Sequence, residues 1–367
     1  MKPRLFFIDN LRAVVIVLVI VLHASITYML FAPEWWYVVD PDQGIGFTML
    51  VLLVDVPLMP IMFFAAGFFA LRSLERRGSR AFIREKVVRV AIPWVFGVLF
   101  LAPLATYMTL VSRGIPRGYL EFWTTDFWGP LYQQSVYWFL GVLFAMFVML
   151  AWAYEASPHL QAFAYRVERP RARLFLTFIA LTAAGSVLAA PLYGLDDWEP
   201  RAILFVVQPA RIAFYAGYFA LGIYAERRGW FTVTGFRPAL GPWGWGCVIA
   251  GAGYLAFRMA GSPTTVPERA IGSVLFSTFC LTALVAGLAL FQGWINAGEG
   301  RWRTLTDNSY GIYYVHPLIL YPLAYLLVGL AVPAPVKAVI LVAVTLGASL
   351  AVSALVLKRL PGVRKAF

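Results

Sequence analysis

Long apolar stretches are the feature that most constrains this chain. A helix rises about 1.5 Å per residue, so about 20 apolar residues cross the hydrocarbon layer of a bilayer. Backbone polar groups in lipid need internal partners, which a helix provides, and the alternating ten-residue segments of a membrane barrel are not seen. The sequence therefore predicts an all-α integral membrane protein, with residues 1–367 forming a single multi-pass domain. About ten transmembrane helices are expected, near 11–31, 47–71, 88–112, 137–155, 174–193, 202–225, 239–259, 271–293, 309–330 and 336–357.

The distribution of basic residues predicts the orientation in the membrane. The net charge is +12, but the basic residues are scattered between apolar stretches and do not form a stripe, so no nucleic-acid partner is expected. Of the 30 Lys and Arg residues, 22 lie in segments on the side of the N-terminus and six on the other side. Positive charge accumulates on the cytoplasmic side of membrane proteins. Both termini are therefore predicted to be cytoplasmic, with the lipid bilayer as the surrounding partner.

Two ionisable residues interrupt the first apolar stretch. Arg12 and His23 are separated by ten residues, so their side chains lie about 16 Å apart along a helix, one near the cytoplasmic face and one near the midplane. Arg12 either reaches lipid phosphates or contacts a substrate, and His23 is either a hydrogen-bonded packing residue or a reactive one. Ionisable groups inside a membrane are expensive and often functional. Both residues are therefore candidates for chemistry.

The ninth apolar stretch contains a second deep histidine. If its helix begins with Ser309 as the cap, His316 lies about 10 Å into the membrane from the cytoplasmic side. His316 and His23 are then expected in one layer, which requires the first and ninth helices to pack together. Tyr313 lies three residues before His316, where it can face the same site or serve in packing.

Two further charges lie inside predicted helices. Asp55 is expected near the midplane, and Arg211 lies within the sixth stretch. Asp55 either orients His23 or forms a structural ion pair with Arg211. Pro57 and Pro60 predict a kink in the second helix, whose freed carbonyl groups must face protein or a cavity.

A basic segment on the cytoplasmic side follows the second helix. It carries seven basic residues between Arg72 and Arg89, including Arg84. The phosphates of an anionic cytoplasmic donor such as a coenzyme A thioester require cationic contacts of this kind, although topology alone explains the same charges. The sequence has no cysteine and histidine spacing for a metal, and its two cysteines do not indicate a disulfide.

The motifs together resemble the acyltransferase family 3 membrane proteins, a group that includes polysaccharide O-acetyltransferases and glucan-succinylating proteins. The resemblance extends over nearly the whole chain and rests on motifs in a characteristic order. These are Arg12 with His23, residues 63–69 (FFAAGFF), Arg84 and Arg89 before Pro93, residues 137–140 (YWFL), and residues 309–313 (SYGIY) followed by His316.

This resemblance implies an O-acyltransferase of the bacterial-type inner membrane. The donor would be a cytoplasmic acyl-coenzyme A, acetyl-CoA or succinyl-CoA, and the acceptor a hydroxyl group of a carbohydrate or glycan, with no metal cofactor. His23 would act as general base or transient acyl carrier, and Arg12 would contact the donor. Arg84 and Arg89 would assist at the cytoplasmic mouth, and His316 and Tyr313 would position a substrate. Any transfer beyond the membrane would need an extracytoplasmic partner protein.

Two other classes of function fit parts of the sequence. A multi-pass transporter or flippase for a sugar-containing or small anionic solute would also use helices broken near Pro57, Pro60 and Pro209, although paired interruptions in two related halves are not found. A sensor would use buried histidines as proton switches. Consumption of a thioester distinguishes the enzyme from both.

Overall fold

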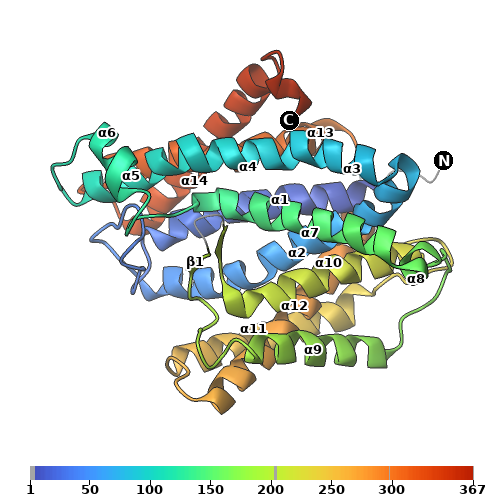
Figure 1. The fold of residues 1–367 in the computed structure, drawn as a ribbon. Coiled ribbons are helices and arrows are strands. Elements are labelled where there is room, and N and C mark those ends of the chain that lie inside the picture. The colour runs from blue at the N-terminus through green and yellow to red at the C-terminus, as the bar shows by residue number, and fades with distance from the viewer. Residues whose placement is uncertain (1–4, 202–204, 297, 367) are drawn as a thin grey trace.

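The structure, a computed structural model, describes residues 5–201, 205–296 and 298–366. Most of these residues form long helices that run side by side across the molecule (Figure 1). Nine of the helical elements are α1 (Phe6–Ile26), α2 (Ile45–Arg77), α7 (Trp138–Ala156), α9 (Ala172–Val187), α10 (Ile212–Arg227), α11 (Leu240–Met259), α12 (Val266–Trp294), α13 (Gly300–Leu327) and α14 (Ala334–Val352).

Another long helical rod is assembled from several pieces. It consists of α3 (Ser79–Lys86), α4 (Ile92–Phe96) and α5 (Ala102–Ser112), joined by π-helical turns at Val87–Ala91 and Gly97–Leu101. Short elements fill the connections: α6 (Tyr119–Glu121), α8 (Pro158–Gln161), β1 (Glu199–Arg201) and β2 (Phe205–Val207).

Six helical segments in the described part of the chain are long and apolar enough to cross a membrane. They are Phe6–Ile26, Ile45–Arg77, Ser79–Ser112, Ser135–Ala156, Val266–Trp294 and Ala334–Leu357. The remaining four predicted stretches also contain helices, but α9 and α10 have only 16 residues each and α11 and α13 are less apolar. The prediction of a helical membrane protein is thereby confirmed in its general form.

Two predicted helix starts differ from the structure. The sixth helix was expected from residue 202, and residues 202–204 lie outside the described residues. Immediately beyond them, β2 pairs antiparallel with β1, and α10 begins only at Ile212. The ninth helix begins at Gly300, so Ser309 lies inside α13 and is not its cap. The ninth helix begins early because hydropathy locates entry into an apolar layer, whereas a helix can begin in the polar sequence before it.

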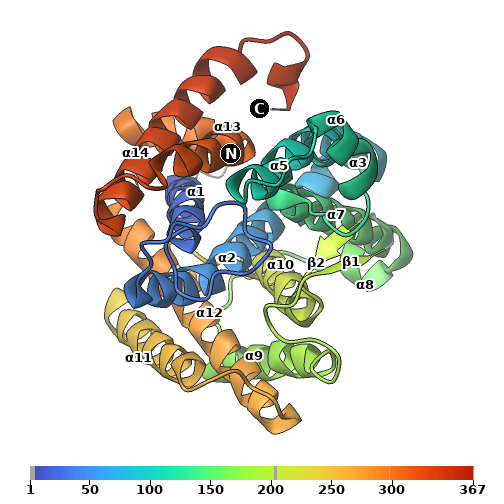
Figure 2. The same ribbon diagram turned by 90° about the vertical axis from the view of Figure 1, so that its left-hand side faces the viewer.

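Helix α1 is surrounded by other helices. It packs against α2, α12, α13 and α14, and the end-on view in Figure 2 shows it between α14 and α2. Its first turn is tied to the segment that follows α12, because the amide of Phe7 donates to Asn296 and the side-chain amide of Asn10 donates to the carbonyl of Ile295, at 2.7 Å. These bonds fix the helix that carries Arg12 and His23.

The outer surfaces of several helices expose large apolar side chains. Leu176 on α9 is 66% exposed, Ile249 on α11 is 69% exposed and Val339 on α14 is 69% exposed. A protein in water rarely leaves contiguous apolar surface of this kind uncovered. Lipid acyl chains provide the apolar contact that these side chains lack within the protein.

Glycines bring α2 and α10 into close contact. A side-chain carbon added at Gly67 would overlap the backbone carbonyl of Phe219, and one added at Gly222 would overlap the carbonyl of Phe64. Helices in lipid associate largely through close packing at small residues, because lipid removes most of the hydrophobic driving force. The glycine of the 63–69 motif therefore has a structural role at the α2–α10 contact.

Prolines inside the helices free carbonyl groups that side chains then satisfy. A proline has no N–H, so the carbonyl four residues earlier loses its helical partner. Three such carbonyls accept a hydrogen bond from a side chain. The carbonyl of Val56, freed by Pro60, accepts from Cys280 Sγ at 3.2 Å. The carbonyl of Arg89, freed by Pro93, accepts from the Tyr310 hydroxyl at 2.8 Å, and that of Leu99, freed by Pro103, accepts from Trp123 Nε1 at 3.1 Å. The predicted satisfaction of freed carbonyls by protein is confirmed at Val56.

Candidate functional site

The two predicted intramembrane histidines contact each other. Nδ1 of His23 lies 3.0 Å from Nε2 of His316, and the two rings are nearly parallel, with centroids 5.2 Å apart and an interplanar angle of 14°. The expectation that the first and ninth helices pack together is confirmed, because this contact joins α1 to α13. His316 is completely buried, whereas His23 is half-buried in the last turn of α1. The His316 ring is thus enclosed by protein, whereas part of the His23 ring is accessible.

The position of His316 depends on a proline one residue later. Pro317 has no N–H to donate to the carbonyl of Tyr313, and Nδ1 of His316 lies 2.7 Å from that oxygen. Because α13 begins at Gly300, His316 lies 16 residues after the start of its helix and not seven as a cap at Ser309 implied. The local sequence therefore both places this histidine and supplies its hydrogen-bond partner.

A cavity of about 350 Å³ lies among α1, α2, α7, α13 and the basic segment. Three basic side chains line it: Arg12 from α1, and Lys86 and Arg89 from the basic segment. Another part of the lining consists of apolar and aromatic side chains, such as Met62 on α2 and Phe139 on α7. The cavity thus combines a cationic end with an apolar wall, which suits a ligand with an anionic head and a less polar arm.

The three basic residues differ in their surroundings. The Arg12 side chain is 40% exposed and lies 3.8 Å from Asp9, and Arg89 lies 3.5 Å from Glu85. Lys86 Nζ lies 4.8 Å from the centre of the Phe147 ring. None of these contacts is a tight bidentate pair, so the cations retain donors for a bound anion.

The sequence-based selection of cations in this segment was incomplete. Arg84, expected at the mouth of the site, is exposed and does not line the cavity, whereas Lys86 was overlooked and does line it. Helical spacing gives a usable signal. Lys86 comes four residues after the fully buried Phe82 and so shares its inward face, while Arg84 projects to the other side.

The cavity ends short of the histidine pair. Its lining on α1 reaches Ile16, which is seven residues and about 10 Å before His23 by helical rise. On α13 the lining reaches Tyr313, whose carbonyl binds His316 and whose hydroxyl donates to the carbonyl of Val136. Tyr313 is therefore the residue that connects the cavity wall to the histidine pair.

Aromatic side chains cover His23 on the side away from the cavity. The ring of Trp36 lies 5.7 Å from that of His23, and Tyr37 stacks on Tyr321 with centroids 4.0 Å apart. The connection between α1 and α2 that carries these residues is anchored by a buried ion pair between Asp40 and Lys337, at 2.9 Å. This anchored connection forms a lid over the histidine pair on the predicted outer side.

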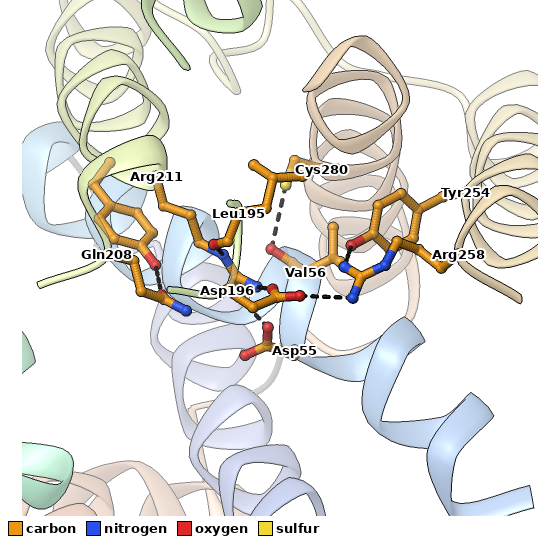
Figure 3. Close-up of polar contacts among 10 residues, drawn as sticks. Asp55, Val56, Leu195, Asp196, Gln208, Arg211, Tyr254, Arg258 and Cys280 are labelled. Carbon is orange, nitrogen blue, oxygen red and sulfur yellow. Dashed lines mark hydrogen bonds and ion pairs between the residues drawn. The ribbon is translucent and has the colours of Figure 1, made fainter. Parts of the chain in front are cut away.

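Asp55 forms an ion pair with Arg211, which the sequence left as the alternative to a contact with His23. Nη1 of Arg211 lies 2.6 Å from the Asp55 carboxylate, and among the described residues Asp55 makes no contact with His23. Arg211 also binds Asp196, which bonds to Arg258 at 2.6 Å (Figure 3). The partner of His23 is His316, so the hypothesis that Asp55 orients His23 is wrong and the structural pair is confirmed.

Asp196 and Arg258 were not predicted to belong to this cluster. Partial desolvation raises the pKa of Asp196, whose side chain is 47% exposed, but the charges of Arg211 and Arg258 outweigh it and hold that pKa below its usual value. The carboxylate therefore stays ionised near neutral pH and joins the connection before β1 to Arg211, directly before α10, and to Arg258 on α11. The acidic run at residues 196–199 was the available signal, but only the fold shows its partners.

Replacement of Arg211 by glutamine is expected to destabilise the protein by about 2 kcal/mol, because it removes the charged hydrogen bonds from one buried guanidinium to two partly exposed carboxylates. The guanidinium is 4% exposed and binds Asp55 and Asp196 together. Arg117→Gln is the matched control, since Arg117 makes an exposed pair with Asp126 at 2.7 Å. Thermal unfolding in detergent measures both variants. Equal shifts in Tm would contradict a structural role for the cluster.

Among the residues that the structure describes, no group of three or more His, Cys, Asp or Glu side chains is placed to hold a metal ion. The described side chains at the site provide an imidazole pair beside a cationic cavity. Such a pair can accept and return a proton, and the cations can bind an anionic substrate.

Comparisons with known proteins give similarity over almost the whole chain. A family model described as Acyltransferase domain matches residues 5–356. The glucans biosynthesis protein C of Salmonella schwarzengrund (strain CVM19633) is 24% identical over 355 residues, covering 88% of this chain and 84% of that protein. The protein of the same name from Salmonella paratyphi A (strain ATCC 9150 / SARB42) is 23% identical over 348 residues, with the same coverage. No solved structure matches.

Proposed function

This chain belongs to the acyltransferase family whose model matches residues 5–356, and on that premise we propose that it is a membrane-bound O-acyltransferase. It takes an acyl group from a cytoplasmic acyl-coenzyme A and transfers it to a hydroxyl group of a carbohydrate or glycan. The acyl group is acetyl or succinyl. The relatives named glucans biosynthesis protein C support a glucan as the class of acceptor.

The observation that carries the proposal is a cationic cavity directed toward the contact between His23 and His316. Arg12, Lys86 and Arg89 gather at the end of the cavity nearest the predicted cytoplasmic face. Coenzyme A carries phosphates that arginine and lysine recognise through charge-assisted hydrogen bonds. Its long pantetheine arm would lie along the apolar wall, with the thioester directed toward Tyr313 and the histidine pair.

The proposed reaction is proton transfer coupled to acyl transfer. His23 takes the proton of the acceptor hydroxyl, and the oxygen attacks the thioester carbonyl carbon. The carbon–sulfur bond breaks, and the departing thiolate takes the proton from the His23 imidazolium to give free coenzyme A. In the alternative role the same nitrogen of His23 carries the acyl group transiently before the acceptor attacks.

The proposed arrangement in the membrane has ten crossings with both termini in the cytoplasm of a bacterial-type inner membrane. The uneven distribution of 22 and six basic residues supports it, as do the six long apolar helices. The cationic end of the cavity then opens to the compartment that contains acyl-coenzyme A. The lid that carries Trp36 faces the other compartment, where a partner protein could present or receive the acceptor.

The experiment that tests donor recognition compares two donors in proteoliposomes. Arg12→Gln, Lys86→Gln and Arg89→Gln are each expected to raise KM for acetyl-CoA about tenfold to hundredfold, because each removes a charge-assisted contact to phosphate. KM for acetyl-pantetheine, which lacks the phosphates, should hardly change. The measurement is transfer of radiolabelled acetyl groups to a glucan acceptor.

The matched control is Arg80→Gln, since Arg80 belongs to the same basic segment but is exposed and does not line the cavity. It should leave both KM values unchanged. Equal effects of the cavity variants on the two donors would contradict phosphate recognition. Solute flux without consumption of the thioester would contradict the enzyme proposal and favour a transporter.

A further inference from the structure

We infer that His316, held by a carbonyl group that Pro317 leaves unpaired, fixes the His23 imidazole in the tautomer with its proton on Nδ1, leaving Nε2 as the proton acceptor. The tautomer follows from the hydrogen bonds together with the burial of His316, whereas its catalytic consequence rests on the proposed function. His316 is then a positioning residue, and it acts on substrate only through His23.

The chain of hydrogen bonds begins at the backbone of α13. In a regular α-helix the N–H of residue 317 would donate to the carbonyl of Tyr313, but a proline has no such donor. Nδ1 of His316 lies 2.7 Å from this oxygen. A carbonyl oxygen can only accept, so Nδ1 of His316 carries a proton.

The second step is the state of the His316 ring. The ring is completely buried, and among the described residues neither histidine contacts a carboxylate that would balance a positive charge. Burial of an unpaired cation is costly, so the resting pair is neutral. In a neutral imidazole protonated on Nδ1, Nε2 is an acceptor. His316 therefore presents an acceptor to its neighbour.

The third step gives the tautomer of His23. Nε2 of His316 can only accept across the 3.0 Å contact, so Nδ1 of His23 donates. Nε2 of His23 then carries a lone pair, and within the described part of the chain it has no hydrogen-bond partner. The half-buried ring is thus prepared to accept a proton from a substrate hydroxyl.

The same arrangement stabilises His23 after it has accepted a proton. Its Nδ1–H bond to His316 becomes charge-assisted, and charge-assisted bonds are about twice as strong as neutral ones. A carboxylate performs the corresponding role for the histidine of the serine protease triad. A neutral histidine here provides orientation without placing a fixed negative charge inside the membrane.

Nitrogen NMR of the full-length protein tests the tautomers directly. The chain has only three histidines, so ¹⁵N-histidine labelling gives three side chains to assign, and His159→Gln removes the one on α8. Proton placement on Nδ1 is expected for both His23 and His316. A dominant Nε2–H form at His23 would overturn the inference, whatever the outcome of the acyl-transfer assay.

Two proline variants on α13 test the role of the freed carbonyl. Pro317→Ala restores a donor that competes with His316 for the Tyr313 carbonyl, while Pro322→Ala restores one further along the same helix. For Pro317→Ala we expect a mixture of His23 tautomers and a fall in kcat of about fivefold to tenfold, with KM for the donor unchanged. Pro322→Ala should retain the wild-type spectrum. Identical behaviour of the two variants would contradict the inference.

Two variants of His316 separate hydrogen bonding from packing. His316→Phe fills a similar volume without an acceptor, and His316→Gln keeps both a donor and an acceptor. We expect kcat to fall about hundredfold with phenylalanine and clearly less with glutamine, while KM for the donor stays constant. Equal losses, or a loss confined to KM, would show that His316 serves packing or substrate binding and would overturn the inference.

Discussion

Replacement of His23 by alanine is expected to lower the rate of acyl transfer about thousandfold, because general-base or nucleophilic catalysis by a side chain contributes about 10² to 10⁴. The ring is half-buried and its loss leaves His316 bonded to the Tyr313 carbonyl, so the fold should persist. KM for acyl-coenzyme A should change little, because the cations of the cavity lie about 10 Å or more away by helical rise. Single-turnover transfer in proteoliposomes measures the effect.

The control for this result is His159→Gln, which changes the histidine on the short helix α8. It should retain full activity. Added imidazole is expected to restore part of the activity of His23→Ala, because a small base can occupy the vacated space. Full transfer by a correctly inserted His23→Ala protein would remove His23 from the mechanism.

Replacement of Gly67 by leucine is expected to destabilise the folded protein by at least about 3 kcal/mol, since no rotamer change avoids a clash with backbone. The added carbon would overlap the carbonyl of Phe219 on α10. The two helices must then separate, which also disturbs the α2 side of the cavity, where Met62 lies. Thermal unfolding in detergent and the yield of monodisperse protein measure the effect.

Gly46→Leu is the matched control on the same helix. A side chain at Gly46 meets nothing within 4 Å, so the substitution should leave Tm almost unchanged. If Gly67→Leu were as stable as Gly46→Leu, the close contact of α2 with α10 would not be a determinant of the fold.

The candidate site was predictable where its geometry is local. Arg12 and His23 lie on one continuous helix, whose regular rise fixes their separation. The placement of His316 in one layer with His23 is confirmed by their 3.0 Å contact, although the predicted start of its helix was wrong. The position of Lys86 in the cavity lining was not predicted, because the number of basic residues in the segment does not show which face of α3 each one occupies.

Other parts of the site could not be predicted. Arg258 lies 62 residues from Asp196 in the chain, and no local pattern indicates their ion pair. The choice of Arg211 or His23 as the partner of Asp55 was open for the same reason. Long-range partners of this kind depend on which helices become neighbours.

The sequence by itself determined the helical membrane class, the uneven charge distribution and the backbone constraint at Pro317, because each depends on composition or on residues within one helix. The tertiary structure decided that α1 lies beside α13 and that α2 meets α10 at glycines. Hydropathy cannot decide such neighbours, since a helix surface in lipid and one against another helix are both apolar. The pairing of His23 with His316, 293 residues apart, therefore emerges only from the packed fold.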